Sequence, residues 1–188
     1  MTKQEKDALL RAVRRYVKRN YKPEDSISFS AIGIGPAVIA PRKFDKGTLS
    51  EAAKEALQRG IQQMMAPGFR ELLLDFIQKK GLRNAELYQR SDITKAHFSK
   101  IKNDEDYHPS KDTVLALALG LKLTFDETQE LLNRAGYALT KSSKTDLIVT
   151  YFIRRQIYNV DEVNEILDEM GLPTITNHRK SHERKEEW

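Results

Sequence analysis

The 188-residue chain contains no cysteine, four histidines and no long apolar run. Without cysteine there are no disulfides and no thiolate chemistry, which fits a cytoplasmic protein of bacterial type. No segment approaches the roughly 18 consecutive apolar residues that a membrane-spanning helix needs, and the charged first ten residues lack the apolar core of a secretory signal. We therefore expect a cytoplasmic protein that has no contact with a membrane.

Hydrophobic residues make up 39% of the chain and charged residues 31%, a composition typical of globular proteins. The net charge of +5 is unevenly distributed. Residues 1–66 hold 13 Lys/Arg against 7 Asp/Glu, residues 67–137 hold 11 of each, and residues 138–188 hold 8 against 9. The basic part of the protein is thus the N-terminal segment.

The N-terminal segment, residues 1–66, is predicted to contain a helix at 3–20, short strand-like stretches between 26 and 39, and a helix at 51–65. The first helix carries a basic stripe beside its apolar one. This stripe has three interpretations: an arm that binds phosphates, a solvated face, or a docking site for an acidic partner. Its members are Arg11, Arg14, Arg15, Lys18, Arg19 and Lys22.

After a break at residues 66–68 the pattern becomes helical and we expect a mainly α fold. Five helices are predicted at 69–80, 84–90, 94–102, 111–119 and 125–135, with stops at Gly81, Gly120 and Gly136. Two more helices, at 144–157 and 160–170, form a C-terminal extension over 138–173. The charged tail, 174–188, is expected to be disordered. No internal repeat is evident.

The segment 84–102 contains a specific pattern within the domain 67–137. Leu87 is apolar in the first of two short helices, Ile93 lies in the turn, and Thr94 can cap the second helix, which Phe98 and Ile101 anchor at a spacing of three residues. This pattern resembles the λ-repressor/Cro (xenobiotic-response-element type) helix-turn-helix family, and the following two helices resemble that family's fourth and fifth.

The resemblance implies a five-helix domain whose second short helix lies in the major groove of duplex DNA. It further implies which residues face the DNA. The candidates for base contacts are Lys95, Ala96, His97 and Ser99. The candidates for phosphate contacts are Arg90, Thr94, Lys100, Lys102, Ser110 and Lys111, to which the N-terminal helix could add Arg11, Arg14, Arg15 and Lys18.

Residues 103–172 also resemble the C-terminal segment of some bacterial macro-domain (ADP-ribose-binding) proteins, on residues 106–111, 135–137 and 142–153. An appended segment of this kind implies an adaptor role. The carboxylates of Asp104, Glu105 and Asp106, which follow the second short helix, also oppose a phosphate backbone.

No arrangement of residues indicates catalysis, so we expect no enzyme, no cofactor and no metal. His178 and His182 have the spacing of two ligands on one helical face but lack a third. Two hypotheses remain. The protein is a sequence-specific, helix-turn-helix transcriptional regulator that binds double-stranded DNA as a homodimer, or the same fold binds another protein, for example in a bacterial defence or stress system.

Overall fold

A computed structural model describes residues 2–23, 55, 68–104 and 106–176. These residues hold eight α-helices and no strand, so the mainly α fold is confirmed for this part of the chain. The expected strands at 26–39, most of the expected helix at 51–65, and the His178/His182 pair lie outside the described residues. Among the helices described, none has the length and hydropathy to cross a membrane.

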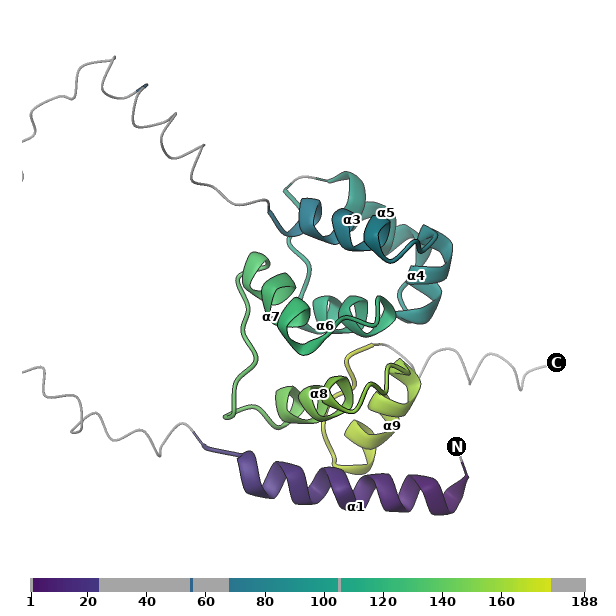
Figure 1. The fold of residues 1–188 in the computed structure, drawn as a ribbon, viewed down its shortest axis with the longest axis vertical. Coiled ribbons are helices and arrows are strands. Elements are labelled where there is room, and N and C mark those ends of the chain that lie inside the picture. The colour runs from purple at the N-terminus through teal and green to yellow at the C-terminus, as the bar shows by residue number, and fades with distance from the viewer. Residues whose placement is uncertain (1, 24–54, 56–67, 105, 177–188) are drawn as a thin grey trace, which may run out of the picture. The chain divides into compact units, whose positions relative to one another are not determined.

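The helices follow one another with short connections, and Figure 1 shows their arrangement. Each predicted helix outside the undescribed residues is found, with ends that differ by a few residues at most. Their bounds are α1 Lys3–Asn20, α3 Phe69–Lys79, α4 Asn84–Arg90, α5 Lys95–Asn103, α6 Lys111–Gly120, α7 Phe125–Arg134, α8 Lys144–Arg154 and α9 Val160–Glu169.

Helix α1 packs against the C-terminal helices. It begins with a capping box, in which Thr2 Oγ1 accepts from the Glu5 amide at 3.3 Å and the Glu5 carboxylate accepts from the Thr2 amide at 2.7 Å. Val13 and Val17 are buried, and α8 is the main neighbour of the helix. The sequence grouped α1 with the rest of residues 1–66, whereas the contacts place α1 in the same compact unit as α3 to α9.

Thr94, the predicted N-cap of α5, accepts a hydrogen bond from a backbone amide of that helix, and Ser110 and Thr124 cap α6 and α7 in the same way. The predicted stop at Gly120 is confirmed to within one residue, because Gly120 is the last residue of α6, but the left-handed residue that follows the helix is Lys122, at φ +52°.

Glycine at position 120 has a packing role instead of a capping role. A Cβ atom there would overlap Ser91 Oγ and come within 3.2 Å of the Leu87 side chain. Gly120 therefore allows α4 and α6 to approach each other closely, which the sequence pattern of a helix stop did not reveal.

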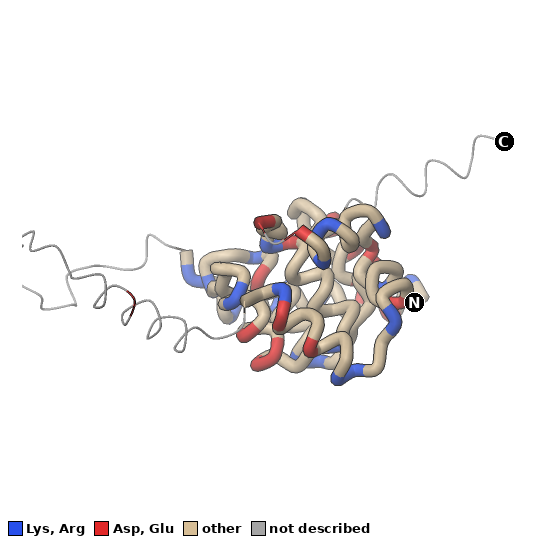
Figure 2. Tube along the Cα trace, turned by 90° about the horizontal axis from the view of Figure 1, so that it is seen from above, with Lys and Arg blue, Asp and Glu red and all other residues tan. Residues whose placement is uncertain are grey.

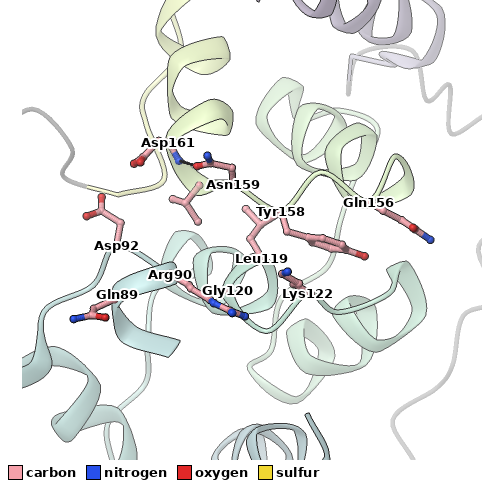
Figure 3. Close-up of a pocket in the computed structure, with 11 residues that line it drawn as sticks. Gln89, Arg90, Asp92, Leu119, Gly120, Lys122, Gln156, Tyr158, Asn159 and Asp161 are labelled. Atoms are coloured by element: carbon pink, nitrogen blue, oxygen red, sulfur yellow. Dashed lines mark hydrogen bonds between the residues drawn. The ribbon is translucent and has the colours of Figure 1, made fainter. Parts of the chain in front are cut away.

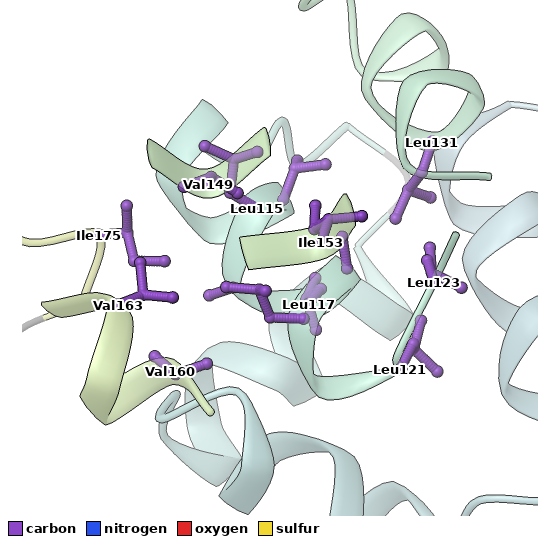
Figure 4. Close-up of a cluster of buried hydrophobic side chains, with 14 of the residues drawn as sticks. Leu115, Leu117, Leu121, Leu123, Leu131, Val149, Ile153, Val160, Val163 and Ile175 are labelled. Carbon is purple, nitrogen blue, oxygen red and sulfur yellow. The ribbon is translucent and has the colours of Figure 1, made fainter. Parts of the chain in front are cut away.

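Helices α6 and α8 form the centre of the unit. Every residue of 113–120 and of 146–153 is buried, because α6 contacts α4, α7 and α9 while α8 contacts α1, α7 and α9. Figure 4 shows Leu115 and Leu117 of α6 in one cluster with Val149 and Ile153 of α8. Residues 67–137 and 138–173 therefore share a hydrophobic core.

The chain beyond α9 is anchored as far as Thr176. Ile175 is 5% exposed and its amide donates to Asn164 Oδ1 at 3.0 Å. Asn164 Nδ2 donates to Thr176 Oγ1 at 2.7 Å, and Thr176 Oγ1 donates to Asp92 Oδ2 at 2.6 Å. The expected disorder of 174–188 therefore does not hold for its first three residues, since Ile175 fills the core and buried polar groups are satisfied.

Candidate functional site

Helix α5 presents part of the predicted DNA-contact set to solvent. Phe98 and Ile101 are buried beneath it, which leaves Lys95, Ala96 and Ser99 exposed. The helix carries three lysines and no carboxylate over its length. This face can supply hydrogen-bond donors, a methyl group and positive charge to an anionic partner.

His97 and Lys100 on the same helix are held by Tyr107. His97 is half-buried, and its Nε2 lies 2.9 Å from Tyr107 Oη. The Lys100 ammonium lies 4.5 Å from the centroid of the Tyr107 ring, a cation–π contact. Burial, and secondly the charge of Lys100, lower the pKa of His97 below its ordinary value, which favours the neutral ring. His97 would have to leave Tyr107 to reach a base.

The acidic loop after α5 is confirmed as exposed at its two described carboxylates. Asp104 and Asp106 are both solvent-accessible, and Asp104 Oδ1 accepts a hydrogen bond from the Asp106 amide at 3.2 Å. These two charges lie next to the C-terminal end of α5, where they reduce the positive potential that its lysines create.

Several predicted phosphate contacts already have partners. Lys111 Nζ lies 2.6 Å from Asp146 Oδ2, and the Asp146 side chain is 3% exposed. The same oxygen accepts hydrogen bonds from the Thr140 amide at 2.8 Å and hydroxyl at 3.1 Å. Lys111 therefore neutralises a buried carboxylate, a role that sequence reasoning missed because the two residues lie on different helices.

Arg90 and Ser110 are also engaged. Arg90 pairs with Glu86 one turn earlier on α4 at 2.5 Å. The Ser110 hydroxyl caps α6 and lies 2.9 Å from Thr113 Oγ1. Thr94 caps α5, while Lys102 is half-buried.

The basic stripe of α1 does not join the α5 face. Arg11, Arg14, Arg15 and Lys18 are exposed, but α1 neighbours α8, whereas α5 neighbours α3 and α4. Figure 1 shows α1 and α5 on different sides of the unit, with α6 and α8 between them. Figure 2 shows basic and acidic positions interspersed around the unit. The predicted site residues thus form two surfaces.

A polar pocket that sequence reasoning missed lies between the end of α4 and the α6–α7 and α8–α9 turns. Its volume is about 620 Å³, within the range of small-molecule sites. Figure 3 shows Arg90, Lys122, Gln156, Tyr158 and Asp161 around it. These side chains offer cationic, amide, phenol and carboxylate groups, which together suit a small polar ligand with charges of both signs.

Among the residues that the structure describes, no three His, Asp or Glu side chains come together as a metal site. Comparisons of the chain with protein-family models, with curated proteins and with solved structures find no match.

Proposed function

We propose that this protein is a sequence-specific DNA-binding regulator that places α5 in the major groove. The observation that supports the proposal is the exposed face of α5, a short capped helix that follows a tight turn and carries three lysines and no carboxylate. In this proposal, α3 to α7 form the five-helix domain of the λ-repressor/Cro type that the sequence resembles.

The residues near the start of α5 read the bases. Lys95 donates to guanine O6 or N7, Ala96 contacts a thymine methyl group, and Ser99 donates or accepts. His97 joins them when it exchanges Tyr107 for a base edge. Thr94, Lys100 and Lys102 position the helix on phosphates.

The partners found for Arg90, Ser110 and Lys111 make them weaker candidates for phosphate binding than the sequence implied. Lys111 in particular cannot leave Asp146 without exposing a buried charge to an apolar environment. Any contact of these residues with DNA would therefore use hydrogen-bond donors that their present partners do not engage. The helix N-terminus that Ser110 caps still offers backbone amides.

A homodimer fits this function, because regulators of this type read two half-sites about one helical turn apart. The test is selection of bound sequences from a random duplex pool, followed by affinity measurements on the selected site. Lys95→Ala should relax the preference at one base position, whereas Lys102→Ala should weaken binding about equally across sequences. A pool that yields no enriched sequence would contradict the proposal.

The acidic loop favours a second candidate function, in which the same fold binds a protein. Asp104 and Asp106 are exposed beside α5, and Tyr107 holds two of the helix's potential donors. A basic partner would be attracted by this edge and a phosphate backbone repelled. Asp104→Asn with Asp106→Asn should then weaken capture of the partner, whereas the same change should strengthen DNA binding if the first proposal holds.

A further inference from the structure

A groove whose charged lining residues are all arginines lies between α1 and α8. Its volume is about 500 Å³, and its basic side chains are Arg15 and Arg19 of α1 and Arg155 at the end of α8. No aspartate or glutamate lines it. Sequence reasoning identified the α1 stripe but not this groove, because Arg155 comes from a distant helix.

Two tyrosines build the floor of the groove and orient its cations. The rings of Tyr16 and Tyr151 lie 5.3 Å apart, where α1 packs on α8. The Arg155 guanidinium lies 5.7 Å from the Tyr151 ring centroid, and Arg15 and Arg19 are one helical turn apart on either side of Tyr16. The packing that docks α1 thus gathers three guanidinium groups.

Two carboxylates of α9 pair with another cation of α1. Lys6 pairs with Glu165 at 3.4 Å and with Glu169 at 3.2 Å, nearer the start of α1, and the Glu169 carbonyl accepts from Arg14 at 3.5 Å. Within the described part of the chain, no carboxylate pairs with Arg15, Arg19 or Arg155.

Three unneutralised guanidiniums in one groove repel each other. Like charges one turn apart on a helix destabilise it, and the negative ends of the α1 and α8 dipoles offset this only in part. A bound anion would remove the repulsion. Guanidinium forks match phosphate oxygens in a bidentate geometry, so phosphate is the anion that three arginines fit best.

The shape of the groove favours a polymer over an enclosed small molecule. Arg11, one turn before Arg15, and Lys18, beside Arg19, continue the basic surface along one flank of the groove residues of α1, which suits a run of phosphates. Tyr151 is 9% exposed, so its ring is not free to stack on a base, and the contact is with the backbone.

We propose that the α1–α8 groove binds the phosphate backbone of a second nucleic-acid segment, on a different side of the protein from α5. This extends, and in that sense rests on, the DNA-binding function proposed above. Because α5 and the groove are separate, one molecule could hold two duplex segments at once.

The test compares two triple variants in the full-length chain. The groove variant is Arg15→Gln, Arg19→Gln and Arg155→Gln. The control removes three equal charges from exposed positions outside both the groove and the basic stripe of α1, by Lys3→Gln, Lys122→Gln and Lys141→Gln. Each is measured by fluorescence anisotropy with a random-sequence duplex over a salt series, alone and combined with Lys95→Glu and Lys100→Glu.

We expect the groove variant to reduce the slope of log affinity against log salt by about 2 to 3, while the control changes it less. The conservative variant with lysine at the three groove positions should retain much of the binding, and unchanged thermal unfolding shows that each variant is folded. An immobilised duplex should capture a second, labelled duplex through the wild type but not through the groove variant.

Equal slopes for the groove and control variants would overturn the proposal. The proposal would also be overturned if the groove variant lost binding of inorganic pyrophosphate but still bound duplex as the wild type does. The occupant of the groove would then be a free phosphate compound. If Lys95→Glu with Lys100→Glu leaves duplex binding unchanged while the groove variant abolishes it, DNA reading by α5 is contradicted and phosphate binding by the groove is supported. If instead the α5 variant abolishes duplex binding and the groove variant leaves it unchanged, DNA reading by α5 is supported and phosphate binding by the groove is contradicted.

Discussion

Among the residues that the structure describes, three non-glycine residues adopt the left-handed backbone conformation, and all three line the pocket of Figure 3. Asp92, Lys122 and Gln156 have φ values of +49°, +52° and +58°. Each follows the end of a helix, a position where glycine is favoured. The Asp92 side chain accepts a hydrogen bond from Thr176 at 2.6 Å, whereas the side chains of Lys122 and Gln156 line the pocket.

Relief of the steric strain of the left-handed conformation should stabilise the protein. Lys122→Gly and Gln156→Gly should each raise the free energy of unfolding by about 0.5–1 kcal/mol, because glycine adopts this conformation without steric cost but loses more backbone entropy. Urea denaturation measures the change. Lys122→Ala, which removes the side chain and keeps the strain, is the control, and an equal gain from alanine would refute the explanation.

The Lys111–Asp146 pair should matter for stability. Lys111→Ala leaves a carboxylate that is 3% exposed without its cation, and we expect a loss of about 1–3 kcal/mol, moderated by the two hydrogen bonds from Thr140. The double variant with Asp146→Asn should recover part of this loss in the same denaturation assay. A double variant as unstable as Lys111→Ala alone would show that the charge is not the cause.

At the level of helices, the contact of α4 with α6 depends on two small residues. Gly120 has no room for a side chain, and Ser91 Oγ, against which it lies, is buried and lacks a hydrogen-bond partner among the described residues. A buried hydroxyl of this kind costs stability without contributing a bond.

The two positions should therefore be coupled. Gly120→Ala should destabilise the protein by about 1–3 kcal/mol through overpacking. Ser91→Ala should be neutral or stabilising, and it should reduce the cost of Gly120→Ala because it removes the overlapping oxygen. A double-mutant cycle from thermal unfolding gives the coupling, and strictly additive effects would contradict this packing.

Helix positions could be predicted from the sequence because their signals are local. The helix starts are marked by the cap residues Thr94, Ser110 and Thr124, and two helix ends are marked by Gly81 and Gly136. Each of these residues lies within a few positions of the helix end that it indicates. The packing role of Gly120 could not be predicted, because a glycine required by a neighbouring helix has the same sequence signature as one that ends a helix.

The sequence of the last four helices also contains a relationship that only the structure made visible. Helices α6 and α7 contact each other, as do α8 and α9, and Asp126, Glu127, Glu130 and Gly136 recur 35 residues later as Asp161, Glu162, Glu165 and Gly171. We did not predict a repeat, since only these few positions match and one connection is a residue longer.

The candidate site was predictable in part. The exposure of Lys95, Ala96 and Ser99 followed from the helical spacing of the buried Phe98 and Ile101. The contacts of His97 and Lys100 with Tyr107 did not, because they depend on how the loop after α5 folds back. The pocket and the α1–α8 groove likewise join residues that are far apart in the chain.

On the scale of the whole molecule, the described helices of the three regions that the sequence predicted, residues 1–66, 67–137 and 138–173, share one core. Leu115 and Leu117 of α6 are fully buried in a cluster that includes Val149 and Ile153 of α8. Burial of a leucine contributes about 1.5–3 kcal/mol, so loss of α8 and α9 would remove much of the stabilisation of α6.

A fragment of residues 67–137 should consequently fail to fold. Without the C-terminal helices it exposes the α6 face, and its circular dichroism should show no cooperative thermal transition. The full-length chain, treated identically, is the control. A fragment with a sharp transition and dispersed amide resonances would show that the helix-turn-helix region is an independent domain.

The most direct test of the proposed function is the affinity of purified protein for a duplex selected from a random pool, measured against an excess of competitor duplex. Lys95→Glu with Lys100→Glu is compared with Lys122→Glu with Lys141→Glu, which makes the same charge change away from α5. DNA reading by α5 predicts that the first variant loses about tenfold or more in affinity while the second stays near wild type. Equal losses, or no duplex binding by the wild type at low salt, would contradict it.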